Sequence, residues 1–243
     1  MFLQFLGTRG EIELSTPRHQ LHSSLLVVHS GKRIMVDCGS DWRDELGRIR
    51  PDAIALTHAN PDHAAGLRDG APCPVYATAE AHKGIAEYPI AKRETIKLRT
   101  PREIQGATFE AFAVDHSARC PAVGYRISGG GVTIFYCPDV AEIPDLGKAL
   151  KDVCVYIGDG ASLTRGLLRK KGNKVLGHAS IRSQLEWCAE HGVRRAFFTH
   201  CGTEIVSQDG RGAARGLRVL AREFGVTTKF AHDSMQTAIS KGA

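Results

Sequence analysis

Residues 57–66 read Thr57-His58-Ala59-Asn60-Pro61-Asp62-His63-Ala64-Ala65-Gly66 and follow a short apolar run. A strand that ends in a tight Asn-Pro turn lets the side chains of His58, Asp62 and His63 converge on one point. Imidazole nitrogens and carboxylate oxygens are ligands that suit zinc, iron or manganese. The alternative is a hydrogen-bonded His/Asp cluster that caps the next helix. The segment is therefore a candidate metal site.

Four further acidic or imidazole residues each stand at or just past the C-terminal end of a predicted strand: Asp37, His116, Asp139 and His200. A single histidine is more often a core or surface residue than a ligand. Repeated placement at strand ends favours a ligand role instead, because a metal site above a sheet edge needs side chains arranged in this way.

Short apolar runs dominate the first two thirds of the chain, and we expect strands at 24–29, 33–37, 53–56, 74–78, 108–114, 122–127, 132–136 and 153–157. Runs that are apolar at successive positions are typical of a sheet covered on both faces. The pattern then changes to a helix over about 180–191, a strand over 195–199, a second helical stripe and an edge strand over 226–230. This order predicts an α/β chain with layered sheets and a single domain, 1–243.

The composition excludes several classes of protein. With 42% hydrophobic and 24% charged residues, the chain is neither disordered nor fibrous. Its longest aliphatic run, 25–28, is far short of the roughly 20 residues that cross a bilayer, and no secretory signal is visible. Seven scattered cysteines include no closely spaced pair, so neither a zinc ribbon nor a redox pair is encoded. We expect a cytoplasmic protein with no membrane partner.

Positive charge is concentrated in the last third of the chain. Residues 161–243 carry 14 Lys and Arg against 6 Asp and Glu, which favours an anionic substrate or partner. Some of this charge precedes His178 in a stretch that Gly172-Asn173 marks as a loop. The residues there either attract a phosphorylated substrate or form a solvated loop. The candidate substrate-binding residues are Arg165, Arg169, Lys170 and Lys171.

His178 precedes the predicted helix, and His200 ends the strand that follows it. A helix of about 13 residues rises about 20 Å, and a strand of five or six residues returns about 17–20 Å. The two histidines should therefore lie side by side, unless His178 is only a surface residue at the helix start. Asp159 either holds His178 in one tautomer or is a turn aspartate.

On these residues the chain resembles the metallo-β-lactamase-fold superfamily over nearly its whole length. Asp37 matches the first motif, and His58-Ala59-Asn60-Pro61-Asp62-His63 matches the second, His-x-His-x-Asp-His. His116, Asp139 and His200 match the third to fifth motifs in order. The resemblance implies a four-layer α/β/β/α sandwich with one or two divalent metal ions (Zn, Mn or Fe) at the sheet edges.

The same resemblance implies two ligand sets that share Asp139. The first metal would be held by His58, residue 60, His116 and Asp139. The second would be held by Asp62, His63, Asp139 and His200, while Asp37 would orient ligands from behind them. Asn60 stands where the family usually has histidine. A neutral amide oxygen is a poorer donor to zinc than imidazole, which predicts weaker occupancy of the first position or a tilt toward manganese.

Three further segments resemble the phosphodiesterase branch of the family, which includes the tRNA 3′-end processing endonuclease and the cyclic phosphodiesterase of phosphonate breakdown. They are 2–8, Gly177-His178-Ala179-Ser180, and His116-Ser117 with 123–125. In that branch the matching histidine assists the transition state or the leaving group. The implied chemistry is attack on phosphorus by a metal-bound hydroxide, with Asp62 orienting the water or taking its proton and His178 acting on the phosphate.

The size of the substrate follows from a spacing. Only 22 residues separate His116 from Asp139, and two predicted strands occupy them. The long arm of the tRNA-processing enzymes does not fit there. We therefore expect a small or cyclic phosphodiester, an anionic small molecule, and do not favour a nucleic acid.

Other functions stay open. A thioester or other ester hydrolase of the same fold would need neither His178 nor the basic residues before it, and lactam hydrolases are normally exported. A non-hydrolytic metal-binding or redox member is favoured only by Asn60. The sequence leaves the oligomeric state open, with a homodimer among the options.

Overall fold

Two seven-stranded sheets form the centre of the computed structural model, which describes residues 1–172, 174–207 and 211–240. The first sheet has the order β16 (Gln236–Ala238), β1 (Phe2–Gly7), β2 (Ser24–His29), β3 (Lys32–Val36), β4 (Ala53–Ala55), β5 (Val75–Ala77) and β6 (Arg93–Thr95). The second has the order β15 (Thr227–Phe230), β14 (Arg195–Thr199), β11 (Val155–Asp159), β10 (Val132–Tyr136), β9 (Ala122–Gly129), β8 (Ala107–Val114) and β7 (Arg102–Ile104). A separate hairpin pairs β12 (Leu167–Lys171) with β13 (Lys174–His178).

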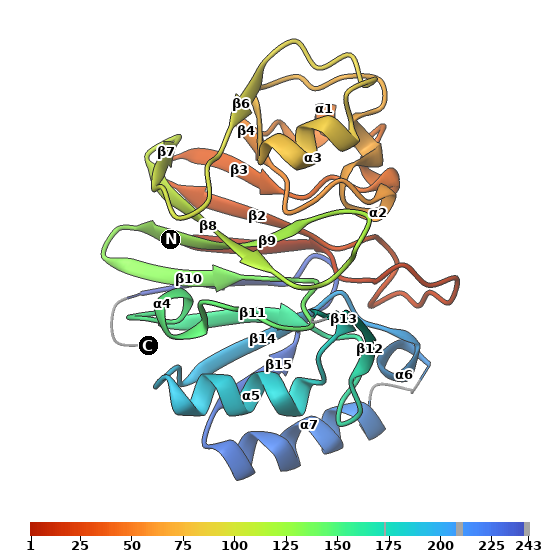
Figure 1. Cartoon of the computed structure of the whole chain (residues 1–243), viewed down its shortest axis with the longest axis vertical. Coiled ribbons are helices and arrows are strands. Elements are labelled where there is room, and N and C mark those ends of the chain that lie inside the picture. The colour runs from red at the N-terminus through yellow and green to blue at the C-terminus, as the bar shows by residue number, and fades with distance from the viewer. Residues whose placement is uncertain (173, 208–210, 241–243) are drawn as a thin grey trace.

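Helices cover the outer faces of the stacked sheets, as Figure 1 shows. The first sheet carries α1 (Leu46–Ile49), α2 (Pro61–Ala64), α3 (Ala79–Gly84) and the 3-10 turns Ser40–Trp42 and Ala65–Leu67. The second carries α4 (Leu146–Ala149), α5 (Ile181–Glu190) and α7 (Arg211–Phe224), and α6 (Thr203–Val206) follows β14. The predicted α/β class and four-layer α/β/β/α sandwich are confirmed.

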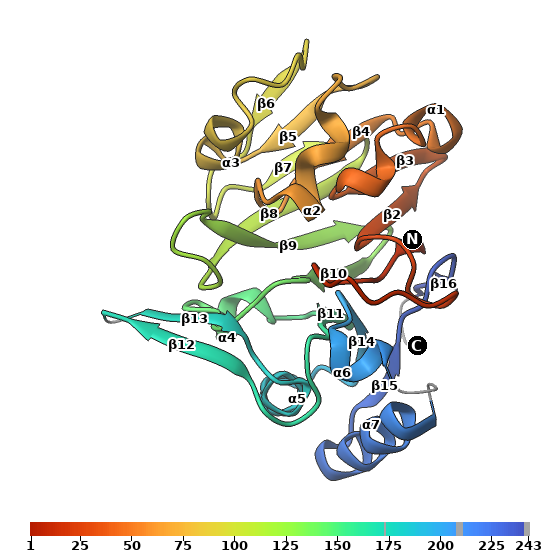
Figure 2. The same ribbon diagram turned by 90° about the vertical axis from the view of Figure 1, so that its right-hand side faces the viewer.

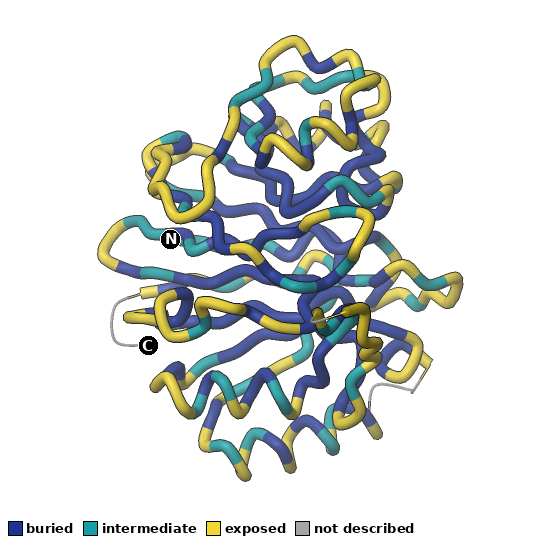
Figure 3. The backbone as a smooth tube through the Cα atoms, viewed as in Figure 1, coloured by how far each residue is buried: buried dark blue, intermediate teal, exposed yellow. Residues whose placement is uncertain are grey.

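Buried side chains form a core on both faces of each sheet. Phe5 and Tyr125 belong to the layer between the sheets, Trp42 to the layer outside the first sheet, and Leu185 to the layer outside the second. The buried backbone accordingly runs along the strands of both sheets in Figure 3. Because both faces are covered, the central strands are apolar at successive positions instead of alternating.

Parallel pairing brings the strand ends that precede the candidate ligands to one edge of the sandwich. In the first sheet β3 pairs in parallel with β4, and in the second β11 pairs in parallel with both β10 and β14. The carboxyl ends of parallel neighbours lie side by side, and the residues that follow them share that edge. Polar residues that are far apart in the sequence therefore become neighbours.

The main difference from the sequence prediction concerns the segment before His178. Gly172-Asn173 suggested a loop, but the described residues on either side form β12 and β13, and Asn173 itself lies outside the described residues. All five residues of β12 are exposed, so no alternation of apolar and polar side chains marks it as a strand. The short strands β6, β7 and β16, and β1 near the N-terminus, were also not predicted. The predicted strands before residue 160 and the edge strand β15 are confirmed.

No helix of the described residues is long and apolar enough to span a membrane.

Candidate metal centre

Six polar residues from both sheets gather at the common strand edge. They form two groups that share Asp139, and within each group the potential ligand atoms all lie within 4.8 Å of one another. One group contains Asp62, His63, Asp139 and His200, and the other contains His58, His116 and Asp139. Every member is buried. The structure thus brings together the histidines and aspartates of the two sets that the family resemblance implies, whereas Asn60 is in neither group. His200 also belongs to a third group, with Asp159 and His178.

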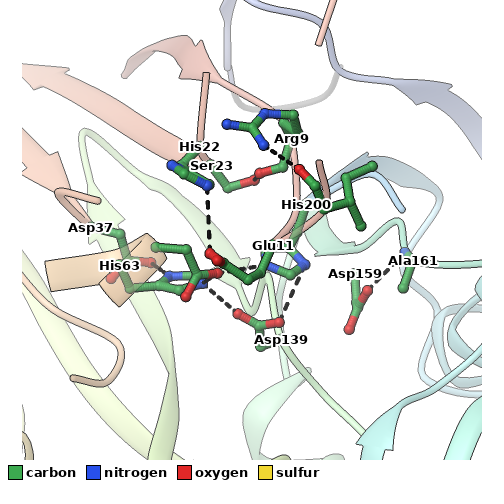
Figure 4. Close-up of polar contacts among 12 residues, drawn as sticks. Arg9, Glu11, His22, Ser23, Asp37, His63, Asp139, Asp159, Ala161 and His200 are labelled. Atoms are coloured by element: carbon green, nitrogen blue, oxygen red, sulfur yellow. Dashed lines mark hydrogen bonds and ion pairs between the residues drawn. The ribbon is translucent and has the colours of Figure 1, made fainter. Parts of the chain in front are cut away.

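Asp139 lies at the centre of this cluster, between His63 and His200 (Figure 4). Its Oδ2 is 2.6 Å from Nε2 of His63 and 3.9 Å from Nε2 of His58, and its Oδ1 is 3.3 Å from Nδ1 of His200. Oδ2 of Asp62 is 3.1 Å from Nε2 of His63 and 3.2 Å from Nε2 of His200. This spacing leaves a polar centre onto which nitrogen and oxygen lone pairs converge.

Unpartnered polar atoms test whether the cluster fits a metal. Among the described residues, seven buried side-chain nitrogens and oxygens have no hydrogen-bond partner, and five of them belong to this cluster. They are Nε2 of His58, Nε2 of His63, both carboxylate oxygens of Asp139 and Nδ1 of His200; the 2.6 Å contact between His63 and Asp139 does not have the geometry of a hydrogen bond. An unsatisfied buried polar group costs about 1–3 kcal/mol, so five in one place would be unusual without a partner. Divalent cations would satisfy all five, and the donor set therefore fits metal.

The charges of the cluster also favour a cation. Burial works against ionisation of Asp139, but the nearby His200 and His63 outweigh it and hold the pKa of its carboxyl well below the usual range. Burial likewise opposes a charged His63, but Asp62, Asp139 and Asp37 raise its pKa well above the ordinary value. Buried carboxylates that stay ionised attract positive charge, whether it is carried by imidazolium or by a metal ion.

Asp37 lies behind the cluster and fixes the orientation of His63. It is fully buried, its Oδ2 is 2.9 Å from Nδ1 of His63, and its Oδ1 accepts hydrogen bonds from the amide (2.8 Å) and hydroxyl (2.9 Å) of Thr57. With Nδ1 engaged, the ring directs Nε2 to the centre. Such carboxylate–histidine contacts are typical of metal sites, and they set the tautomer of the ligand.

Two orienting groups were not found by sequence reasoning. The Thr57 hydroxyl lies 3.0 Å from Nδ1 of His58, and the carbonyl of Gly177 lies 3.1 Å from Nδ1 of His116. Each contact leaves Nε2 of the histidine free to face the cluster. Thr57 stands inside the quoted segment, but nothing in its identity marks this role, and a backbone carbonyl has no sequence signal at all.

Two residues at this edge have a left-handed backbone. Asp37 and His200 both have positive φ, +65° and +53°, which L side chains adopt at a cost of about 1–2 kcal/mol. Asp37 directly follows β3, and His200 directly follows β14. In this backbone conformation Asp37 contacts His63 and His200 lies within the cluster. Close packing supports this: a Cβ at Gly39 would lie 2.0 Å from the carbonyl oxygen of Asp62, so only glycine lets the two segments meet there.

His178 ends β13 and lies beside the cluster. Its ring centroid is 5.6 Å from that of His200, which confirms the predicted juxtaposition, and 5.0 Å from that of His116. Its Nδ1 is 2.7 Å from Oδ2 of Asp159, a fully buried residue whose Oδ1 also accepts from the amide of Ala161. Asp159 therefore both orients His178 and stabilises a turn. Burial opposes protonation of His178, but Asp159 outweighs it and raises the pKa to about 9.

Two small cavities meet at His178. One of about 330 Å³ is also lined by Asn60, His116 and Arg169, and one of about 430 Å³ is also lined by His200 and Arg165. Arg165 and Arg169 thus lie at the candidate site. Lys170 and Lys171 line a third cavity of about 550 Å³, which shares Arg169 with the first. The basic residues therefore divide into a near pair and a more distant pair.

Two further histidines, His19 and His22, are buried. His22 places Nδ1 2.7 Å from Oδ2 of Asp41, and His19 places Nδ1 2.9 Å from the Thr8 hydroxyl. Neither is among the grouped potential metal ligands. Polar partners on distant segments bury both rings, and local sequence does not reveal such partners.

Asn60 provides a test of the first ligand set. Asn60→His is expected to increase the zinc retained after chelator challenge, because it replaces a neutral amide oxygen by an imidazole beside His116. Metal content before and after EDTA treatment, measured by mass spectrometry, checks this. Asn60→Ala is the control, since it removes the amide without adding a donor. Equal zinc retention in the histidine and alanine variants would contradict a ligand position at residue 60.

Comparison with known proteins identifies a family whose model matches most of this chain. Residues 32–201 match the model of a family described as a beta-lactamase superfamily domain. A ribonuclease Z of Bradyrhizobium diazoefficiens is 43% identical over 70 residues, covering 27% of this chain and 22% of that protein. An octanoyltransferase of Porphyromonas gingivalis is 29% identical over 147 residues, covering 50% and 30%. The chain thus spans less than a third of the length of these curated relatives.

Solved structures share the fold over the whole chain. Zinc-bound PqqB from Methylobacterium extorquens has a TM-score of 0.75 at 20% identity, covering 98% of this chain and 100% of that one. A diphosphatase of the PhnP family has a TM-score of 0.71 at 21% identity and covers 98% of each chain. At this level of identity the likeness establishes architecture alone.

Proposed function

The chain belongs to the β-lactamase superfamily, and from that premise we propose that it is a metal-dependent hydrolase, specifically a phosphodiesterase acting on a small or cyclic phosphodiester. One observation carries this proposal. His178, held by the buried carboxylate of Asp159, lines both cavities beside the candidate metal ligands. An alkyl phosphodiester needs a proton on its basic leaving oxygen, and a held imidazole at that place is suited to supply it.

The metal ligands proposed are those gathered around Asp139. His58, His116 and Asp139, together with Asn60, would hold one cation, and Asp62, His63, Asp139 and His200 would hold the other. When bound, two divalent cations supply an ionised water nucleophile at neutral pH and offset charge on phosphoryl oxygens. Asp37, which bonds His63 from behind, keeps that ring in the tautomer that presents Nε2.

Asp62 and His178 have separate tasks in this proposal. Burial alone would raise the pKa of Asp62, but His63 and His200 hold it well below the usual range, so the carboxylate stays ionised. It would orient the attacking water and accept its proton. His178 would donate a proton from Nε2 to the leaving oxygen, while Asp159 accepts from Nδ1 and offsets the positive charge of the ring.

The size of the cavities and their charge support a small anionic substrate. Volumes of about 330 and 430 Å³ suit a small molecule. The 22 residues between His116 and Asp139 include β9 and β10, as predicted. They therefore leave no room for a long arm of the kind that the tRNA-processing enzymes carry, which also favours a small substrate. Arg165 and Arg169 line these cavities and would attract a phosphate group, with Lys170 and Lys171 adding charge nearby.

Charge reversal of the near basic pair should weaken substrate binding. We expect the double variant Arg165→Glu/Arg169→Glu to raise KM for an anionic substrate about tenfold at low salt, and less at high salt, because added ions screen the interaction. Steady-state kinetics at two ionic strengths measure the effect. Lys170→Glu/Lys171→Glu should give a smaller rise, and Lys83→Glu on α3 is the surface control. An unchanged KM in the first variant would leave these arginines as solubilising charges only.

A substrate panel tests the proposed activity itself. After reconstitution with manganese, zinc or iron, hydrolysis of bis(p-nitrophenyl) phosphate should exceed that of a glutathione thioester and of a chromogenic cephalosporin by about tenfold or more. Faster turnover of the thioester would replace the proposal with a thioesterase. Metal binding without turnover of any of the three would favour a non-hydrolytic member.

A further inference from the structure

A fourth cavity, larger than the three already described, lies away from the metal cluster. Its volume is about 740 Å³, and α7, β14, β15, β16 and the segment around Arg18 line it. None of the candidate metal ligands is among the lining residues. In Figure 2 these elements lie on the side opposite the β12–β13 hairpin. The proposed hydrolase chemistry gives this cavity no role.

Four cationic side chains surround the cavity: Arg18, Arg195, Arg218 and Lys229. None of them forms an ion pair with a carboxylate of the described residues. The nearby carboxylate of Asp233 is engaged elsewhere, since it accepts from the Thr8 hydroxyl at 2.7 Å and from the amides of Gln20 and Leu21 at 2.8 and 2.9 Å. Like charges around one hollow repel each other and create a positive potential that an anion would relieve.

The inner wall of the cavity is apolar. Phe197, Leu217 and Ile205 are nearly fully buried, whereas Phe230 and Met235 are only partly buried. A polar anion alone would leave Phe230 and Met235 against water. A ligand with an apolar body would cover them and gain about 25 cal/mol for each Å² removed from water.

Two further details show a site that is partly organised. Arg195 is held in place by a 3.1 Å hydrogen bond from its Nη2 to the hydroxyl of Thr237, and its guanidinium lies 5.1 Å from the ring centre of Phe197. The hydroxyl of Thr228, also in the lining, is buried and has no hydrogen-bond partner. A fixed cation offers an anionic ligand a polar contact at little ordering cost, and the unsatisfied hydroxyl belongs to a residue of the same lining.

We propose that this cavity binds an organic anion with an apolar body, such as a carboxylate, sulfate or phosphate ester of small-molecule size. A volume of about 740 Å³ falls within the usual range of small-molecule sites. The anionic group meets Arg195, Arg218 and Lys229, and the apolar body packs against Phe230 and Met235. The site also accounts for part of the positive charge in the last third of the chain.

Dye binding tests the proposal. The aromatic sulfonate 1-anilinonaphthalene-8-sulfonate should bind the folded protein at one site, and the neutral analogue N-phenyl-1-naphthylamine should bind about tenfold more weakly. The double variant Arg218→Glu/Lys229→Glu should raise the dissociation constant of the sulfonate about tenfold, with a smaller effect at high salt. Ala214→Trp should fill the cavity and remove binding of both dyes. Displacement by decanoate or by phenyl phosphate then distinguishes a linear from an aromatic body.

The matched control uses the same helix and the same change in charge. Arg215 and Arg222 are exposed on α7 but do not line the cavity, so Arg215→Glu/Arg222→Glu should leave sulfonate affinity nearly unchanged. Circular dichroism and thermal unfolding verify that each variant is folded, because partly folded chains also bind these dyes. Equal loss of affinity in both double variants, or equal affinity for the charged and the neutral dye, would overturn the proposal.

Discussion

Asp139→Asn is expected to abolish stable metal binding and to reduce the proposed phosphodiester hydrolysis about a thousandfold or more. Asp139 is the one residue that belongs to both groups of candidate ligands, and both of its oxygens are buried without a hydrogen-bond partner. Asparagine keeps the size of the side chain but removes the charge and one oxygen donor. A loss of several kcal/mol of electrostatic stabilisation at two cations corresponds to a rate loss of this order.

Metal analysis and kinetics on the same samples check this expectation. Metal content is measured by mass spectrometry after gel filtration, and turnover is measured on bis(p-nitrophenyl) phosphate. Asp145→Asn is the matched control, because Asp145 is exposed and pairs only with Arg99 and Lys148 among the described residues. An Asp139→Asn protein that keeps two cations per chain would contradict the central position of this carboxylate.

His178→Ala is expected to reduce turnover about 10²- to 10⁴-fold while metal content stays nearly unchanged, which is the usual contribution of a positioned general acid. The loss should depend on the leaving group. An alkyl phosphodiester has a basic leaving oxygen that needs a proton, whereas p-nitrophenolate leaves without one. The variant should therefore lose more activity on the alkyl ester than on the chromogenic ester.

Two companion variants sharpen the His178 experiment. Asp159→Asn removes the charge that bonds Nδ1 of His178 and should reduce kcat about 10- to 100-fold with little change in KM, as expected for a positioning residue. His191→Ala, an exposed histidine at the end of α5, should behave like the unmodified protein. If His178→Ala kept full activity on both esters, the phosphodiesterase assignment would fail although the fold would stand.

Much of the fold was predictable because its strands are local and strongly patterned. Strands such as 24–29 and 132–136 are buried on both faces, and they are therefore recognisable in the sequence as continuous apolar runs. The exposed hairpin β12–β13 has no continuous apolar run, and the segment was therefore predicted as a loop. The short strands β6, β7 and β16 are mostly exposed or half-buried, so they lack the apolar run that made the equally short but buried β4 predictable.

The candidate ligands were predictable for a different reason. Asp139 and His200, and Asp37 behind them, follow strands, and parallel pairing places such strand ends at one edge. The residue types therefore indicated a metal site before any distance was known. The supporting groups were not predictable, because the hydroxyl of Thr57 and the carbonyl of Gly177 act through contacts between segments that are distant in the chain.

Sequence alone thus determined the α/β class, the order of most strands and the residue types gathered at one sheet edge, because each of these depends on local burial and spacing. Tertiary structure alone decided that five ligand atoms point at one centre without partners, that Asp159 holds His178, and that a basic cavity opens beside α7. These features depend on how distant segments meet, and the direction of a side chain across two packed sheets is not encoded in its neighbours along the chain.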